Sequence, residues 1–176
     1  MGKAIGIDLG TTNSVVAFKD VSVRTIQTGA NNEDLCRSCV ALDKSGNFIV
    51  GNSVYSAWKR HAPNIVVSAK RLMGAAISDS NVQKMKADKH SYPFGIQKLS
   101  GGTEESVAIL LHGKEYTPEQ ISAEILRALK NDASNKLGDV EYAVITVPAY
   151  FNEKQKSATK KAAKLAKKQA KKDKKA

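Results

Sequence analysis

The chain has 176 residues, of which 41% are hydrophobic, so it is long enough for one globular domain or two small ones. No apolar run approaches the roughly 20 residues of a membrane span, and residues 1–20 lack the basic stretch and cleavage site of a secretory signal. Of the net charge of +11, residues 151–176 carry +9 (eleven Lys against two acids), which leaves +2 for residues 1–150 and excludes a broadly basic globular surface. We therefore expect a cytoplasmic protein with reduced cysteines and a basic tail.

The first 27 residues have the pattern of a strand meander. Ile5, Ile7 and Leu9 alternate with small or polar residues, which is the period of two expected of a β-strand. Residues 14–19 and 22–27 have the composition of two more strands. The first two strands are joined by a short polar bend.

Two hairpins and a helix are predicted next. Residues 40–42 and 47–50 flank Lys44-Ser45-Gly46, and residues 96–99 and 107–111 flank Ser100-Gly101-Gly102. Between the hairpins, residues 53–62 have a helical pattern. This helix should end before Pro63, because the residue before a proline is biased out of the helical region.

The last part of the chain predicts helix, strand and helix. Thr117 can cap a helix that has Pro at its first position and continues to Gly138. Residues 140–147 read as a buried strand that ends at Pro148, and Asn152 can cap a final helix. With hairpins first and helices later, the pattern indicates a mixed α/β fold.

The bend after the first strand has the chemistry of an anion site. Gly10 permits a tight backbone whose N–H groups point inward, and Thr11 and Thr12 add hydroxyl donors. Asp8 can hold a metal-bound water, so a phosphate with Mg²⁺ fits these residues better than a neutral sugar does. A polar hairpin whose Thr side chains bond to their own backbone explains the same residues. A Walker loop is excluded, because neither Gly-Lys pair is followed by Ser or Thr.

Four stretches of the chain form an ordered set: "GIDLGTTNS", "VGNSVYSAWKRHAPNIVVSAKRLMG", "YTPEQISAEILRALKNDA" and "AVITVPAYFNEKQKSATKKAA". In this order and spacing they resemble the heat-shock 70-kDa chaperone family of the actin-like ATPases. They resemble its first phosphate motif, the segment with its catalytic lysine, the long helix of its first lobe and its first connecting segment. The resemblance covers about residues 2–164 and favours the phosphate loop over the polar hairpin.

The resemblance implies an α/β fold, namely the first lobe of an actin-like (ribonuclease-H-like) nucleotide-binding domain. Such a lobe has a mixed sheet with flanking helices and an inserted small α+β subdomain. We place the lobe at 1–166, with a core at about 1–37 and 116–166 and the insertion at about 38–115. Residues 167–176 form a Lys-rich tail, expected to be frayed or disordered. The family's second phosphate loop, adenosine pocket and peptide-binding domain have no counterpart in this sequence, so we expect an incomplete, truncated version of the family fold.

The resemblance also assigns ligand-binding residues in the first bend. Gly10, Thr11, Thr12 and Asn13 would contact the phosphates of ATP or ADP. Asp8 would act on Mg²⁺ through a water molecule.

Three further positions have an implied role and a simpler alternative. Lys70 matches the catalytic lysine that orients the attacking water, whereas the residues alone equally describe a lysine that snorkels to solvent. Pro148 resembles the proline of an interdomain relay, with Tyr150 and Phe151 beside it. From the residues alone, these three describe the end of a strand with aromatic packing.

The implied function is ATP and Mg²⁺ binding in a molecular chaperone of the stress response. Because one lobe is present, we expect weak nucleotide binding and little or no ATPase or peptide-binding activity alone, and whether the chain is an enzyme stays open. Expected partners are ATP, co-chaperones and a second lobe or copy across the open cleft. The alternatives are a non-enzymatic interaction module, acting through the lobe surface or the tail, and a half-domain that self-associates through an unpaired sheet edge.

The basic tail has three interpretations. It is a solvated Lys/Ala helix, a polybasic segment for nucleic acid or anionic lipid, or a terminus left by truncation. No aromatic residues lie among its lysines as platforms for bases, which favours solvated surface over a binding segment.

Cys36-Arg37-Ser38-Cys39 has the spacing of a redox or zinc pair. One pair supplies two ligands where structural zinc takes four, and the three histidines have no metal-like spacing. We interpret the cysteines as residues at the start of strands rather than as a metal or redox site. Trp58 is interpreted as a packing residue rather than a platform for a ligand.

Overall fold

The computed structural model describes residues 2–173 of the chain. Within this range the strands are β1 (Lys3–Asp8), β2 (Asn13–Lys19), β3 (Val23–Thr25), β4 (Cys36–Arg37), β5 (Cys39–Leu42), β6 (Phe48–Val50), β7 (Ile65–Val67), β8 (Gly95–Lys98), β9 (Val107–Leu111), β10 (Lys114–Tyr116) and β11 (Val140–Thr146). The helices are α1 (Asn52–Ser56), α2 (Trp58–His61), α3 (Ser80–Ala87), α4 (Pro118–Leu137) and α5 (Glu153–Asp173), with a 3-10 helix, η1 (Ala69–Leu72). Strands come first and helices are interspersed among the later strands, so the predicted mixed α/β class is confirmed.

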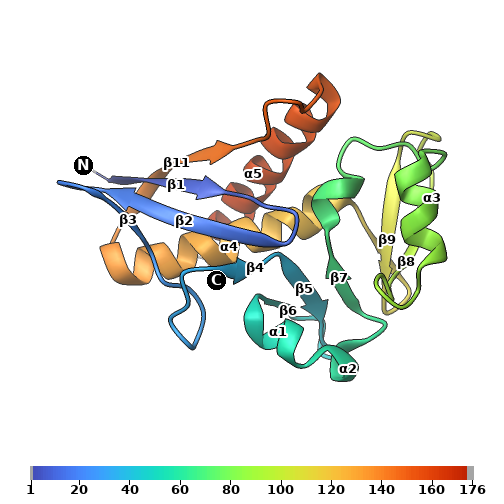
Figure 1. Ribbon diagram of the computed structural model, residues 1–176, viewed down its shortest axis with the longest axis horizontal. Helices are drawn as coiled ribbons and strands as arrows, with labels where there is room; N and C mark the ends of the chain where they lie inside the picture. The colour runs from blue at the N-terminus through green and yellow to red at the C-terminus, as the bar shows by residue number, and fades with distance from the viewer. Residues whose placement is uncertain (1, 174–176) are drawn as a thin grey trace.

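The strands form one large sheet and two small ones (Figure 1). The large sheet has the order β11-β1-β2-β3, with β4 beside β2. β11 runs parallel to β1, and the other pairs are antiparallel. The two small sheets have the orders β6-β5-β7 and β10-β9-β8 and come from the segment predicted as an insertion.

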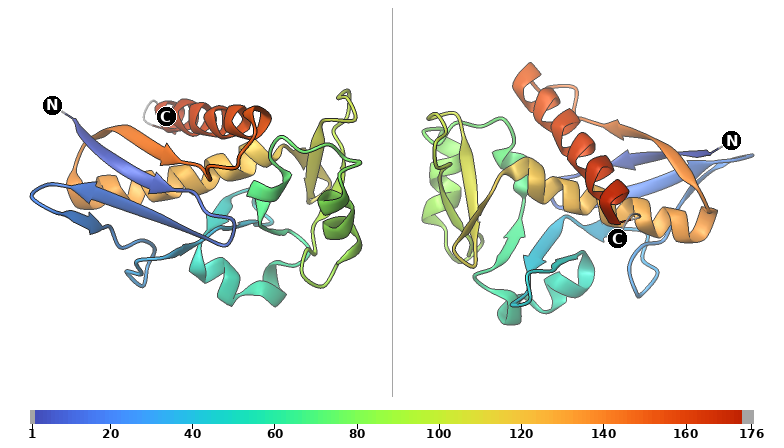
Figure 2. Two further views of the ribbon diagram at one scale, coloured as in Figure 1. Left: turned by 45° about the horizontal axis from the view of Figure 1, so that its top comes forward. Right: turned by 180° about the vertical axis from the view of Figure 1, so that it is seen from behind.

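Helix α4 packs against all three sheets at the large apolar core, and a second, small cluster of buried residues consists of Cys39, Ala41, Val54 and Ile65. It crosses the molecule and contacts β1, β2 and β11 of the large sheet, β5, β6 and β9 of the small sheets, and η1 (Figures 1 and 2). The four apolar residues on its predicted inner face are at most 3% exposed: Ile121, Ile125, Leu126 and Leu129. α5 packs along α4 through buried Ala158 and Ala162.

The predicted helix caps are confirmed at both long helices. Thr117 Oγ1 accepts from Gln120 N at 3.2 Å, and Gln120 Oε1 accepts from Thr117 N at 2.7 Å. Asn152 and Gln155 make the same reciprocal pair at the start of α5, at 2.9 and 3.1 Å. These bonds satisfy N–H groups that a helix start leaves without partners.

Several predicted elements differ in detail. The helix expected over residues 53–62 is divided at Ala57 into α1 and α2, and Tyr55 packs edge-on against Trp58 across the break. The end before Pro63 is confirmed, because Ala62 is extended with ψ of 139°. Three elements have no counterpart among the predictions. The strands β7 and β10 have three residues each, and the helix α3 lacks a strong apolar stripe.

The expectation that residues 140–147 are buried is wrong for most of β11. Tyr142 and Val144 are 64% and 69% exposed. β11 lies at the edge of the large sheet, and these two side chains share the sheet face of Ala4 and Gly6, opposite the buried Ile5 and Ile7. The apolar composition of the strand therefore reflects an uncovered face rather than a core.

The Lys-rich end of the chain continues the last helix. α5 extends through Asp173, so residues 167–173 are helical where fraying was expected, in keeping with the high helix propensity of Lys and Ala. Residues 174–176 of the predicted tail lie outside the described range.

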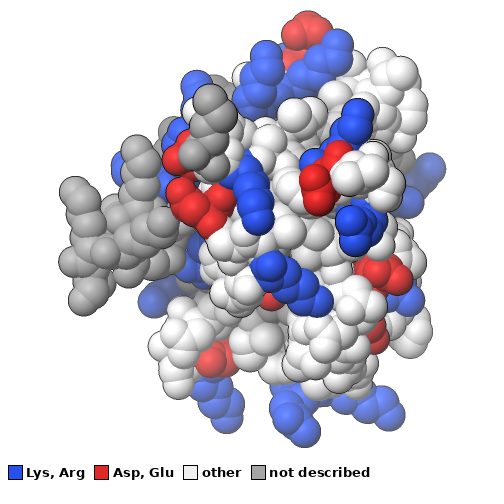
Figure 3. Space-filling model, turned by 90° about the vertical axis from the view of Figure 1, so that its left-hand side faces the viewer, with Lys and Arg blue, Asp and Glu red and all other residues white. Residues whose placement is uncertain are grey.

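On the face shown in Figure 3, Lys and Arg side chains are dispersed with Asp and Glu among them. Among the helices within residues 2–173, none has the length and apolar composition to cross a membrane.

Candidate functional site

The bend between β1 and β2 is closed so tightly that its glycine cannot carry a side chain. A Cβ on Gly10 would lie 1.8 Å from the carbonyl oxygen of Asn13. The requirement is steric contact across the bend rather than a positive φ angle. This close approach folds the backbone from residue 10 to residue 13 back on itself.

Two buried serines hold the bend in place. Ser14 Oγ accepts from Gly10 N at 3.2 Å, and Ser38 Oγ donates to Gly10 O at 2.8 Å. The two hydroxyls are 2.9 Å apart, and Ser38 N donates to Thr12 O at 2.9 Å. Ser38 was not predicted as a site residue, because its sequence context pointed to the flanking cysteines. Its role follows from β4 lying beside β2.

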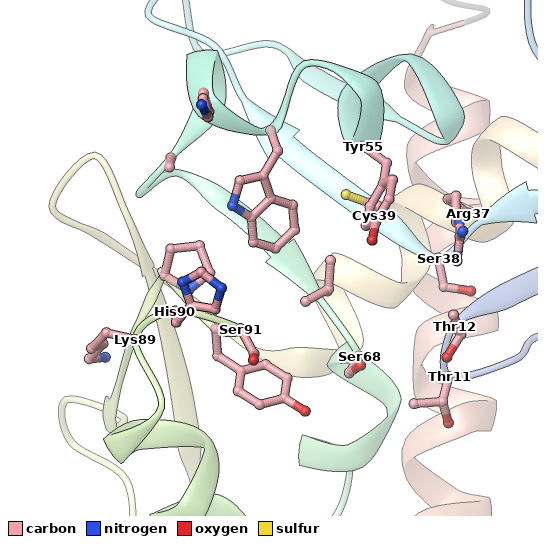
Figure 4. A pocket seen from close by; sticks show the side chains of 16 residues that line it. Thr11, Thr12, Arg37, Ser38, Cys39, Tyr55, Ser68, Lys89, His90 and Ser91 are labelled. Atoms are coloured by element: carbon pink, nitrogen blue, oxygen red, sulfur yellow. The ribbon is translucent and has the colours of Figure 1, made fainter.

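Thr11 and Thr12 lie at the edge of a cavity (Figure 4). Thr12 is exposed and Thr11 half-buried. Within residues 2–173, neither hydroxyl makes a bond to its own backbone of the kind that the polar-hairpin alternative requires. Both hydroxyls therefore remain available to a ligand.

Asp8 ends β1 beside the last residue of β11. Its carboxylate is exposed, and Oδ1 accepts from Thr146 Oγ1 at 3.1 Å. The parallel pairing of the two strands places Asp8 directly opposite Thr146. One oxygen is thus positioned by the protein, and the carboxylate has further lone pairs for a cation or its water.

Lys70 comes from η1 and is 6% exposed, so its ammonium group is buried rather than extended to solvent as the snorkelling alternative requires. Its Nζ donates to Leu9 O at 2.5 Å and lies 4.9 Å from the centre of the Phe151 ring. Burial lowers the pKa of Lys70, and the nearby negative charge of Asp8 partly opposes this effect.

The connecting segment after β11 reaches the site through one of its three predicted residues. Phe151 is 7% exposed and contacts Lys70, whereas Tyr150 is 85% exposed. Phe151 N donates to Pro148 O at 3.0 Å, which closes a turn, and the Tyr150 and Phe151 rings pack edge-on at 5.9 Å. The structure therefore brings together Asp8, Lys70 and Phe151 and leaves Tyr150 at the surface.

The two cysteines lie at the start of β4 and β5, as interpreted from the sequence. Burial raises the pKa of Cys36 to about 11 and that of Cys39 to about 12, so both thiols are protonated at neutral pH. Both are free, and no cluster of three or more His, Cys, Asp or Glu side chains suited to a metal occurs among the described residues.

A cavity of about 870 Å³ opens beside the bend (Figure 4). Its lining comes from the bend, from β4, α1 and α2, and from the segment after α3: Thr11, Thr12, Arg37, Ser38, Cys39, Tyr55, Trp58, Lys59, Ala62, Val67, Ser68, Lys89, His90, Ser91, Tyr92 and Pro93. Trp58 is half-buried, and part of its surface faces this cavity.

In chemical terms, the site combines a folded-back backbone, two hydroxyls, a carboxylate and a buried ammonium group. These groups suit a polyanion accompanied by a hard cation. In a comparison with known families, the model described as Hsp70 protein matches residues 4–169 of the chain.

Proposed function

The chain belongs to the Hsp70 family, and on this premise we propose that its first bend binds the phosphates of ATP or ADP with Mg²⁺. The observation that carries the proposal is the convergence of the bend with Lys70, whose Nζ bonds to Leu9 O beside Asp8 and Phe151. A buried ammonium group is costly unless a negative charge compensates it. A bound polyphosphate supplies such a charge.

Phosphate binding is assigned to the residues of the bend. Gly10 allows the close approach of the backbone, and the hydroxyls of Thr11 and Thr12 donate to phosphate oxygens together with backbone N–H groups. Asn13 begins β2 and fixes the end of the bend. Ser14 and Ser38 position this backbone without contacting the ligand.

Asp8 fits a magnesium site held through water. Mg²⁺ prefers oxygen ligands, keeps several of its waters and is usually bound through one or two carboxylates and the substrate phosphates. Asp8 presents one exposed carboxylate oriented by Thr146. When bound, the cation neutralises phosphate charge, and Asp8 orients one of its waters.

Lys70 is proposed as the catalytic residue of phosphoryl transfer. From its position under the bend, the ammonium group compensates charge on the terminal phosphate and orients the attacking water, the two contributions that this chemistry needs most. We expect Lys70→Met, which keeps the length of the side chain, to lower single-turnover hydrolysis by roughly 10²-fold or more while ATP still binds. Equal hydrolysis in both proteins would remove Lys70 from the chemistry.

The connecting segment is proposed as the relay of nucleotide state. Phe151 contacts the Lys70 ammonium group, and its backbone bonds to Pro148. A shift of Lys70 toward a phosphate is therefore transmitted to the turn that carries the exposed Tyr150. The cytoplasmic location, the stress-response role and contacts with co-chaperones belong to the same proposal.

We also propose that binding and ATPase activity are weak in this chain alone, since the assigned donors come from one side of the ligand. A second candidate, a half-domain that self-associates, is favoured by one observation. β11 is an edge strand that exposes Tyr142 and Val144.

The binding proposal is tested by titrating the chain with Mg·ATP in a calorimeter and by following backbone amide shifts. We expect saturable, Mg²⁺-dependent shifts centred on residues 8–13. Thr11→Ala should weaken binding, since it removes one donor without disturbing a buried contact. Thr103→Ala, in an exposed loop outside the site, is the matched control and should bind as the wild type does. Shifts that are absent, or that do not depend on Mg²⁺, would refute the proposal.

A further inference from the structure

The second half of α5 carries five lysines on one side of the helix. Lys164 is three or four residues from each of the others, a spacing that places side chains on the same side of an α-helix. We call these five side chains the lysine face: Lys160, Lys161, Lys164, Lys167 and Lys168. All five are exposed. At about 1.5 Å per residue, the face is about 12 Å long.

The opposite side of α5 is fixed to the rest of the protein. Ala158 and Ala162 are buried where α5 packs along α4, and Ala163 and Ala166 are partly buried against the same core. The right-hand view of Figure 2 shows α5 at the surface, lying over α4. The lysine face therefore has a fixed direction and is open to solvent.

The lysine face has no acidic partners of its own. Nearer the start of α5, Lys154 pairs with Glu105 at 2.7 Å and Lys156 pairs with Glu153 at 2.9 Å. Within residues 2–173, none of the five lysines of the face makes an ion pair. The positive charge of α5 is thus neutralised at its start and uncompensated along the lysine face.

The spacing of these lysines opposes the helix that carries them. Like charges four residues apart destabilise a helix, and Lys164 has such a neighbour on each side, Lys160 and Lys168. A polyanion that lies along the face removes this repulsion and releases its own condensed counterions. Both effects favour a ligand with many regularly spaced negative charges.

The chemistry of α5 favours a double helix over other polyanions. An amphipathic helix enters a membrane interface through its apolar side, and that side of α5 is occupied by α4. Single strands are held by stacking on aromatic rings, and α5 contains no aromatic residue. A duplex carries about one negative charge per 1.7 Å of its axis and can be bound by lysines through its backbone alone. About seven such charges lie along the length of the face.

From these observations we infer that the lysine face binds the phosphate backbone of a double-helical nucleic acid without reading its sequence. The sequence alone favoured a solvated surface, because it does not show that one side of α5 is fixed and the other is unpaired. The inference goes beyond the proposed function and does not depend on it, since none of the residues assigned to ATP takes part.

The test titrates labelled DNA duplexes of two unrelated sequences with the full chain and follows their fluorescence anisotropy at several salt concentrations. We expect equal affinity for both duplexes. The logarithm of the binding constant should fall with the logarithm of the salt concentration with a slope of about −4 or steeper, as five phosphate contacts imply.

The variant that removes the contacts is the triple change Lys160→Gln, Lys164→Gln, Lys167→Gln. It should weaken duplex binding by roughly 10²-fold or more at about 0.1 M salt and reduce the salt slope by about 3, one for each lysine. Gln is a good helix former, so circular dichroism should show an unchanged helix content. The same three positions changed to Arg keep their charge and should bind as the wild type does.

The matched control removes the same charge elsewhere. Lys19, Lys44 and Lys84 are exposed on β2, on the turn after β5 and on α3. Their triple change to Gln should leave duplex binding close to that of the wild type. Lys161 stays unchanged in all variants, because it lines a hollow together with Glu105, Glu119 and Glu153.

Several outcomes would overturn the inference. An equal loss in the control variant would show a response to net charge, and different affinities for the two duplexes would contradict binding through the backbone. Equal binding to a single strand of the same length or to poly-glutamate, or stronger binding to phosphatidylserine vesicles, would assign the face to another partner. No duplex binding by the wild type refutes the inference and leaves the Mg·ATP experiment unaffected.

Discussion

At the residue scale, the shape of the bend depends on the absence of a side chain at Gly10. Because its Cβ would meet Asn13 O at 1.8 Å, we predict that Gly10→Ala opens the bend and breaks the bonds to Ser14 and Ser38. The free energy of unfolding should fall by about 1–3 kcal/mol, as for other overpacked sites. Mg²⁺-dependent ATP shifts should disappear. Urea denaturation and amide spectra measure the two effects.

Gly46 provides the matched control for this change. It has φ of +85° and no atom within 4 Å of an added Cβ, so Gly46→Ala strains the backbone by about 1 kcal/mol without a clash. It should bind ATP as the wild type does. Retained ATP shifts in Gly10→Ala would contradict the steric account of the bend.

The cysteines predict a pH dependence of stability. Burial raises the pKa of Cys36 to about 11 and of Cys39 to about 12, above the usual value of about 8.5 in an unfolded chain. The folded state thus favours the protonated thiols, and this contribution is complete below about pH 8.5 and is lost as the pH rises toward 11 and 12. Between pH 8 and 10, each thiol should lose about 1–2 kcal/mol of stabilisation.

The measurement compares wild type with the double variant Cys36→Ala, Cys39→Ala by urea denaturation at both pH values. Both proteins contain all the other titrating groups, so the difference between their unfolding free energies reports the contribution of the two thiols. We expect the advantage of the wild type to shrink at pH 10. A difference that is the same at both pH values would show that the thiols ionise as in water.

At the scale of the element, the packing of α4 determines whether the three sheets unfold in one cooperative transition. Leu129 is fully buried on this helix, which packs against all three sheets. We predict that Leu129→Ala lowers the free energy of unfolding by about 2–5 kcal/mol. Because Trp58 lies in the region of the small sheets, its fluorescence should move together with far-ultraviolet circular dichroism in one transition.

Leu35→Ala, at a half-exposed position, is the control and should change stability by less than about 0.5 kcal/mol. If fluorescence and circular dichroism separate into two transitions, the segment of the small sheets unfolds independently and α4 does not couple the three sheets.

At the scale of the whole molecule, the large sheet has an uncovered edge and face. Tyr142 and Val144 on β11 expose apolar surface next to unpaired strand backbone, an arrangement that favours pairing between chains. We predict a sedimentation coefficient that rises with protein concentration. Val144→Lys should reduce this rise without changing stability, because a charge at an exposed edge disfavours pairing.

Val21→Lys places the same charge on a fully exposed residue before β3 and should sediment as the wild type does. A sedimentation coefficient independent of concentration in the wild type would exclude self-association through β11.

Local signals explain what the sequence could predict of this fold. The alternation of Ile5, Ile7 and Leu9, the caps at Thr117 and Asn152, and the stop before Pro63 each depend on residues close together in the chain. All of them are confirmed. The burial of β11 was predicted wrongly, because the same apolar strand is compatible with a core or an uncovered face. What covers a face depends on distant elements.

The candidate site also divides into residues that local sequence could identify and residues whose roles depend on distant elements. Asp8 and the bend that follows it could be proposed from adjacent residues, and Lys70 required the family resemblance. Ser38 carries no local signal, since its bond to Gly10 depends on how β4 lies beside β2. Likewise, the contact of Phe151 with the Lys70 ammonium group follows only from the packing of η1 against the segment after β11.

The parallel pairing of β1 with β11 also has a consequence for the timing of folding. Asp8 and Thr146 are 138 residues apart in the chain yet bond to each other. At the usual synthesis rate of about 5–20 residues per second, β1 is synthesised roughly 7–30 s before its partner strand. During that interval Ile5 and Ile7 lack the neighbouring strand beside which they are buried in the folded chain, so the large sheet is completed late in synthesis.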